Sequence, residues 1–103
     1  MTATSRELVH PDLTDVELTD VLFALSDPAR LALVRLIAAE GAQTVTNCQV
    51  VDPLSPKSTF SHHLKTLREA GVIRNEPRGR QRMVSLRRDE LDERFPGLLG
   101  SVL

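Results

Sequence analysis

The adjacent histidines His62 and His63 and the single cysteine, Cys48, are the side chains of this sequence best suited to metal binding. Imidazole nitrogens and thiolates are the usual protein ligands of zinc. Successive residues of a helix point about 100° apart, so two neighbouring histidines in one helix do not easily ligate the same ion. One cysteine excludes an internal disulfide and a Cys-x-Cys or Cys-x-x-Cys metal clamp. We therefore predict no metal ion and no other cofactor.

The acidic residues do not form a convincing catalytic pair either. Asp89, Glu90, Asp92 and Glu93 open the last predicted helix, where carboxylates are favoured by the helix dipole. The sequence has no Ser/His/Asp arrangement and no Gly-rich phosphate-binding loop. We expect that the protein is not an enzyme, and the ligand set is too poor for a small His/Cys metalloenzyme.

Cys48 leaves one chemical alternative open. A lone cysteine is most often a small, inert hydrophobic residue, and that is the interpretation we favour. A reactive thiol could instead sense oxidants, for example by forming a disulfide between two chains. Chemical reactivity at Cys48 therefore separates the two interpretations.

Basic residues are concentrated in one part of the chain. Residues 53–88 contain nine Lys or Arg and two Glu, a formal charge of +7, which leaves −8 on the remainder of a chain whose net charge is −1. A concentrated basic surface indicates a polyanionic partner, and an acidic remainder disfavours indiscriminate binding.

The 103 residues suit one compact domain, and a domain this small often needs a partner chain. No apolar run approaches the roughly 20 residues of a membrane span. The segment "MTATSRELVHPDLTD" lacks the apolar centre of a signal peptide. We predict a cytoplasmic protein that does not bind membranes, with residues 1–12 as a flexible N-terminal arm and residues 13–103 as the domain.

Hydrophobic periodicity and capping residues predict four helices before a change of period. Thr14 and Glu17 fit a capping box, Asp27 and Pro28 fit the start of a buried helix, and Thr46 and Ser55 are candidate N-caps. Gly41 and Gly71 follow the expected helix ends. The helices are expected at about residues 15–25, 28–40, 47–52 and 56–70.

Two short β-type runs follow, "VIRNEP" and "QRMVSL", with Gly79 in the turn between them. A last helix begins near Asp89 and breaks near Pro96-Gly97. A pair of helices, then the helix at residues 56–70 and then a basic hairpin is the order of a winged helix-turn-helix, a mainly α fold with a two-stranded β-hairpin wing.

The helix at residues 56–70 would present a surface suited to DNA. Apolar residues recur on one side, and the opposite side carries cations, hydroxyls and an imidazole without any carboxylate. Such groups bond phosphate oxygens and base edges in a major groove, and arginines of the hairpin could follow the backbone or enter the minor groove. The predicted DNA-binding residues are Lys57, Ser58, Thr59, Ser61, His62, Lys65, Arg74, Arg78, Arg80 and Arg82.

Two stretches resemble a known family. "FALSDPARLALVRLI" is similar to the second helix of ArsR–SmtB repressors, and "STFSHHLKTLREAGVIRNEPRGRQRMVSL" is similar to their recognition helix and wing. The resemblance covers about residues 15–95. It implies a homodimeric bacterial repressor that pairs through its first and last helices and binds an inverted-repeat operator in double-stranded DNA. By the same resemblance, Ser58, Thr59, Ser61 and His62 occupy base-reading positions.

The sequence departs from that family where metal-responsive members bind their ion. The two positions of their Cys-x-Cys pair are Val45 and Asn47 here, and Cys48 is one residue later. The last helix, residues 89–103, contains no histidine. His10 could contribute to a metal site shared between two subunits, but we expect it to be an ordinary surface residue. We therefore expect a repressor without this metal site, released by an unidentified small molecule or redox signal. A winged helix used only for protein interaction is a further alternative, which the acid-free helix face argues against.

Overall fold

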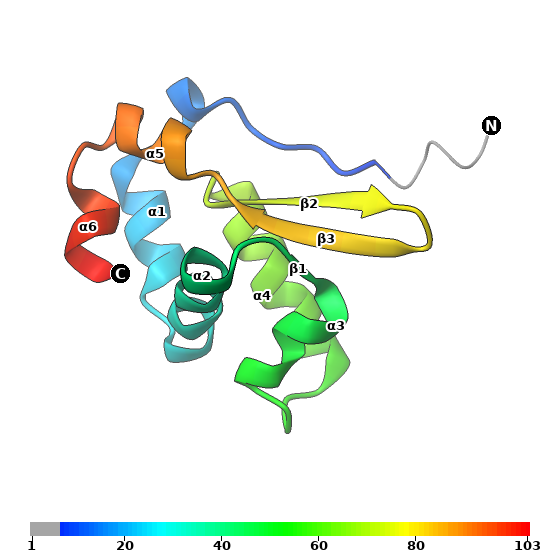
Figure 1. Ribbon diagram of the computed structural model, residues 1–103. Coiled ribbons are helices and arrows are strands. Elements are labelled where there is room, and N and C mark those ends of the chain that lie inside the picture. The colour runs from blue at the N-terminus through cyan, green and yellow to red at the C-terminus, as the bar shows by residue number, and fades with distance from the viewer. Residues whose placement is uncertain (1–6) are drawn as a thin grey trace.

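The computed structural model describes residues 7–103, so half of the predicted arm, residues 1–6, lies outside the described residues. The chain folds into helices around a small antiparallel sheet (Figure 1). The helical elements are η2 (Leu13–Asp15), α1 (Leu18–Leu25), α2 (Pro28–Glu40), α3 (Val45–Cys48), η3 (Gln49–Val51), α4 (Lys57–Glu69), α5 (Arg88–Arg94) and α6 (Leu98–Val102). The strands are β1 (Gln43–Thr44), β2 (Ile73–Arg78) and β3 (Gln81–Leu86). This confirms a mainly α winged helix-turn-helix.

The first helix begins later than predicted, and the capping box proposed for Thr14 and Glu17 is wrong. The Thr14 hydroxyl donates to Asp12 Oδ1 at 2.9 Å, and the same oxygen accepts from the Thr14 amide at 3.0 Å. Asp12 therefore caps the short helix η2. Glu17 is instead the N-cap of α1 and forms a capping box with Asp20. The Thr14 hydroxyl, which the predicted capping box would need, is thus hydrogen-bonded to Asp12 instead.

The start of α2 agrees with the prediction. Asp27 Oδ1 accepts from the amides of Ala29 and Arg30 at 2.8 and 3.1 Å, and Pro28 occupies the first turn. Burial by itself raises the pKa of Asp27. The hydrogen bonds from Arg30 and Ala29 outweigh that effect and hold the pKa of Asp27 below its ordinary value, so the cap is ionised at neutral pH.

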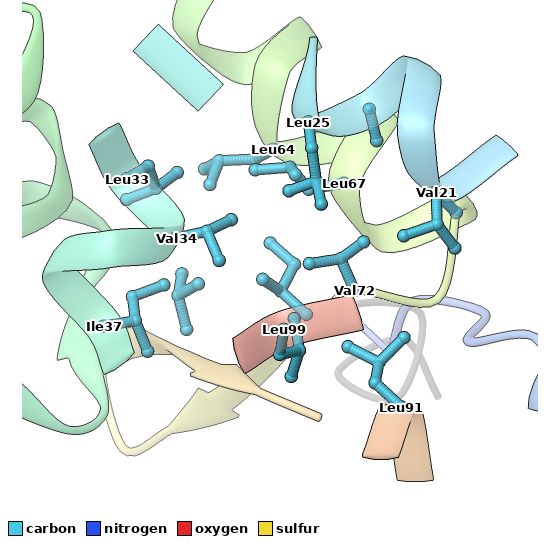
Figure 2. Close-up of a cluster of buried hydrophobic side chains, with 14 of the residues drawn as sticks. Val21, Leu25, Leu33, Val34, Ile37, Leu64, Leu67, Val72, Leu91 and Leu99 are labelled. Atoms are coloured by element: carbon cyan, nitrogen blue, oxygen red, sulfur yellow. The ribbon is translucent and has the colours of Figure 1, made fainter. Parts of the chain in front are cut away.

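The core is almost entirely aliphatic, as the near absence of aromatic residues predicts. Figure 2 shows how its side chains converge from α1, α2, α4, α5 and α6. Because the terminal helices contribute to the same cluster as α4, these helices belong to one packed unit. The fully buried aliphatic residues include Val21, Leu33, Val34, Leu67, Ile73, Val72, Val84, Leu91 and Leu99.

The helix before the turn lies two residues earlier than expected. Thr44 Oγ1 accepts from the Asn47 amide at 3.1 Å and caps α3, so the prediction of Thr46 as the cap is wrong. The cause is β1, which the sequence did not reveal. Gln43 and Thr44 pair with Val84 and Met83 of β3, and this long-range pairing fixes where the chain leaves the sheet. The sheet order is β1-β3-β2.

Helix α4 begins at Lys57, and Pro56 stands at its N-cap without any side-chain hydrogen bond to the first turn. The prediction of Ser55 as the cap is therefore wrong. At the other end Gly71 adopts φ +77°, and a Cβ there would lie 3.1 Å from Val16 Cγ2. Both the positive φ and the limited space beside Val16 therefore favour glycine where α4 leads into the wing.

The wing is a regular hairpin. Ile73 pairs with Leu86 and Arg78 with Gln81, which leaves Gly79 and Arg80 as a two-residue turn. Gly79 has φ +62°, a conformation that favours glycine in such turns. In Figure 1 the hairpin extends beyond the helices. Within residues 7–103, no helix has the length and apolar character needed to cross a membrane.

Candidate nucleic-acid interface

The outer face of α4 has the composition predicted for it. Phe60, Leu64 and Leu67 are buried against the core, and polar side chains on the opposite side of the helix are exposed. The one carboxylate of α4 is Glu69, at its last position. A solvated helix face normally mixes both charge signs, so this face is unusual. Its exposed residues are Lys57, Ser58, Thr59, Ser61, His62 and Lys65.

The two adjacent histidines face different surroundings, as helical geometry predicts. His62 is exposed, and its Nε2 lies 3.5 Å from Thr66 Oγ1. His63 turns toward α2, where its Nδ1 lies 3.1 Å from Arg30 Nη1. A guanidinium can only donate, so Nδ1 accepts and the ring proton is on Nε2, which lies 3.9 Å from Asp27 Oδ1. His63 therefore fixes α4 to α2.

Arg30 is an important residue whose role the sequence did not reveal. Its side chain is only 7% exposed. Nε donates to the carbonyl of Ala24 at 2.7 Å, Nη2 donates to that of Phe23 at 3.3 Å, and the guanidinium lies 5.4 Å from the centre of the Phe23 ring. One cation thus joins the end of α1, the start of α2 and helix α4. The position of Arg30 in the sequence could have indicated that it is buried, because residues 30, 33, 34 and 37 form one buried face of α2.

The four wing arginines fall into two pairs. Arg78 and Arg80 are exposed at the tip of the hairpin. Arg82 donates from Nε and Nη2 to the side-chain and main-chain oxygens of Asn75, both at 2.8 Å. Arg74 donates to Glu90 Oε1 at 3.0 Å. The tip pair is therefore the part of the wing best placed to meet a phosphate backbone.

Glu90 connects the wing base to α5. It accepts from Arg87 Nε and Nη2, both at 2.9 Å, and from Arg74. The hydrogen bonds from Arg87 come first among the causes that lower the pKa of Glu90 to about 2. This carboxylate is therefore ionised throughout the neutral range and holds Arg74 by charge. Among the described residues, no group of three or more His, Cys, Asp or Glu is arranged to hold a metal ion.

Cys48 is completely buried in the core, and burial raises the pKa of its thiol to about 11. The thiolate is the reactive form, so we expect native Cys48 to react with iodoacetamide at pH 7.5 at least about a hundredfold more slowly than in urea. Mass spectrometry of timed samples measures both rates. Equal rates would restore the thiol-sensing alternative, and the variant Cys48→Ser gives the background.

Comparison with known proteins places this geometry in a family. Residues 25–76 match the family described as "Helix-turn-helix domain". The chain is 38% identical over 81 residues to "Uncharacterized HTH-type transcriptional regulator YceK" of Bacillus subtilis (strain 168), covering 74% of this chain and 76% of that protein. A crystal structure of an ArsR family transcriptional regulator superposes with a TM-score of 0.66 at 25% identity, covering 82% and 84% of the two chains. The chain belongs to the ArsR family of helix-turn-helix transcriptional regulators.

A second solved structure agrees with this assignment. It is described as "Possible transcriptional regulator for arsenical resistance" and matches with a TM-score of 0.64 and 34% identity over 80% of this chain and 82% of that one. The resemblance drawn from the sequence motifs is thereby confirmed. An ArsR regulator binds DNA and is not an enzyme, and the matched residues 25–76 contain the whole of α4.

Proposed function

We propose that this ArsR protein is a homodimeric repressor that binds an inverted-repeat operator in a sequence-specific manner. The observation that carries the proposal is the outer face of α4, where every predicted contact residue is exposed and no carboxylate intervenes before Glu69. A helix with short polar side chains and flanking cations can contact both the base edges of a major groove and the phosphates on either side of it.

Different residues would supply affinity and base choice. Lys57 and Lys65, one at the first position of α4 and one two turns later, would bind phosphates, together with Arg78 and Arg80 of the wing tip. Direct contacts to base edges are assigned to the short or planar side chains between them, Ser58, Thr59, Ser61 and His62. Arg74 and Arg82 would contribute charge near the backbone while they hold the wing in place.

Exposed apolar side chains on the terminal helices support a dimer. Leu18 and Leu22 are one turn apart on α1 and are 44% and 45% exposed, and Leu103, the residue that follows α6, is 37% exposed. Pairing of two chains through α1 and α6 would cover these residues. A two-fold dimer of this kind would set its two α4 helices about 34–36 Å apart, one turn of DNA.

The signal that releases the repressor is unidentified. Val45 and Asn47 stand where metal-responsive members have cysteines, and a neutral aliphatic and an amide are poor ligands for soft or borderline ions. The proposed repressor therefore does not use that metal site.

The decisive experiment selects DNA from a random duplex pool with the purified protein and sequences the bound fraction. We expect a near-palindrome whose half-sites are centred about one helical turn apart, with two chains per duplex by analytical ultracentrifugation. Failure to enrich any sequence at low salt would favour a protein-interaction module. Enrichment of a single half-site bound by one chain would refute the dimer alone.

Arg80→Ala tests the role of the wing tip. Because a phosphate contact releases counterions, its loss should weaken binding to every sequence and reduce the slope of log K against log salt concentration by roughly 1. Fluorescence anisotropy at four salt concentrations, with selected and scrambled duplexes, measures both effects. Arg35→Ala removes an exposed arginine of α2 and should leave the slope unchanged. An unchanged slope for Arg80→Ala would remove this residue from the interface.

A further inference from the structure

The segment of residues 9–11, which precedes the first helix, accepts hydrogen bonds from three separate parts of the domain. Arg68 of α4 donates to the carbonyl of Val9. The main-chain N–H of Asn75 in β2 donates to His10 Nε2 at 3.0 Å. Arg87, which follows β3, donates to the carbonyl of Pro11 at 2.8 Å. We call residues 9–11 the strap. In Figure 1 the N-terminal segment runs alongside β2.

The contact at His10 gives a hydrogen-bond acceptor to a main-chain N–H at the edge of the sheet. β2 is an outer strand of the order β1-β3-β2, and β3 occupies only one of its sides. Asn75 is only 7% exposed, so its outward N–H would lack a partner if the imidazole left. A buried donor without an acceptor is unfavourable. The wing therefore depends on His10 for one of its main-chain hydrogen bonds.

The same Asn75 also holds the wing arginine Arg82, through both its side-chain and its main-chain oxygen. His10, Asn75 and Arg82 thus form one chain of hydrogen bonds from the strap into the hairpin. Since Arg68 ties the strap to α4 as well, the strap fixes the placement of the wing relative to the recognition helix.

We propose that His10 is a positioning residue whose neutral imidazole locks the wing onto the strap, so that protonation of His10 releases the lock and weakens DNA binding. The effect on DNA rests on the proposed function, whereas the lock itself does not. An imidazolium has two N–H donors and no acceptor, and it would set its own N–H against that of Asn75.

Charges around His10 reinforce this preference for the neutral form. Arg74 and Glu76 face it from β2, Arg68 faces it from α4, and Arg87 faces it from the end of β3. Burial first, and then Arg74, lower the pKa of His10 below its ordinary 6.5, with Arg68 and Arg87 adding to that effect and Glu76 opposing it. A lowered pKa in the locked state means that the lock is complete above pH 6.5 and is lost as the pH falls through the lowered value.

The lock is tested first without DNA, by NMR of the full chain. We expect the protection factor of the Asn75 amide to fall between pH 7.5 and pH 5.5, in step with titration of the His10 ring. In His10→Ala the amide should be unprotected at both values. In His10→Gln the side-chain oxygen can accept the same hydrogen bond without titrating, so protection should not change with pH. Equal, pH-independent protection in wild type and His10→Ala would overturn the proposal.

The second measurement uses the DNA duplex selected by the wild-type protein. Other parts of the protein and the DNA also respond to pH, so the wild type is compared with His10→Gln at each pH. From pH 7.5 to 5.5 the wild-type Kd should rise about threefold to tenfold more than that of His10→Gln, the range that one hydrogen bond spans. Identical pH profiles would refute the link between the strap and DNA binding. Absence of binding by every variant would count against the proposed function, and the NMR result would still decide the lock.

Discussion

Replacing Arg30 with alanine is expected to lower the free energy of unfolding by about 2–4 kcal/mol. The substitution removes the donors to the carbonyls of Ala24 and Phe23 and to His63 Nδ1. These acceptors lie at the junction of α1, α2 and α4, where water does not replace the guanidinium without cost. For a domain of this size the change corresponds to a fall in Tm of roughly 10 °C or more.

Thermal and urea unfolding followed by circular dichroism measure this effect, at one fixed protein concentration because dimer formation would add to stability. The matched control is Arg35→Ala in the same helix. Arg35 is exposed and donates one hydrogen bond, from Nε to the carbonyl of Val102 at 3.0 Å, so its loss should cost less than about 1 kcal/mol. Equal losses for the two variants would show that the buried guanidinium does not hold the junction together.

The parts of the fold that were predictable are those governed by neighbouring residues. Asp27 with Pro28 set the start of α2, and Gly79 set the turn of the wing. The exposed face of α4 also followed from local periodicity, because Phe60, Leu64 and Leu67 must share one buried side. For the same reason the residues of the candidate interface on α4 could be predicted from their types and their helical spacing.

The parts that were missed depend on contacts distant in the sequence. Strand β1 exists because Gln43 and Thr44 pair with β3, about 40 residues later. Nothing near His10 in the sequence indicates that its ring accepts from Asn75, 65 positions away. Thr14 was misassigned because two carboxylates compete for the same short segment. Preferences of neighbouring residues for caps and turns do not distinguish such arrangements, because contacts with distant parts of the chain decide which one forms.

Replacing Ser61 with glutamate should abolish recognition of the selected duplex while leaving the fold intact. Ser61 is exposed on α4, four residues after Lys57 and four before Lys65. A carboxylate there would pair with either lysine along the helix, which stabilises the helix slightly and withdraws a cation from the phosphates. It would also face the polyanion directly. Opposed like charges cost several kcal/mol, so the Kd should rise at least about a hundredfold.

Two variants isolate the cause of that loss. Ser61→Ala removes the hydroxyl without adding charge, and should weaken binding far less and mainly alter base preference. Ala39→Glu adds the same charge to the exposed side of α2 and should leave the Kd nearly unchanged, since net charge alone has a small effect at physiological salt. Anisotropy titrations of all three, with circular dichroism to confirm folding, complete the test. Wild-type affinity in Ser61→Glu would place the DNA on another surface, because no groove lined by phosphates accommodates an added carboxylate at the centre of its recognition helix.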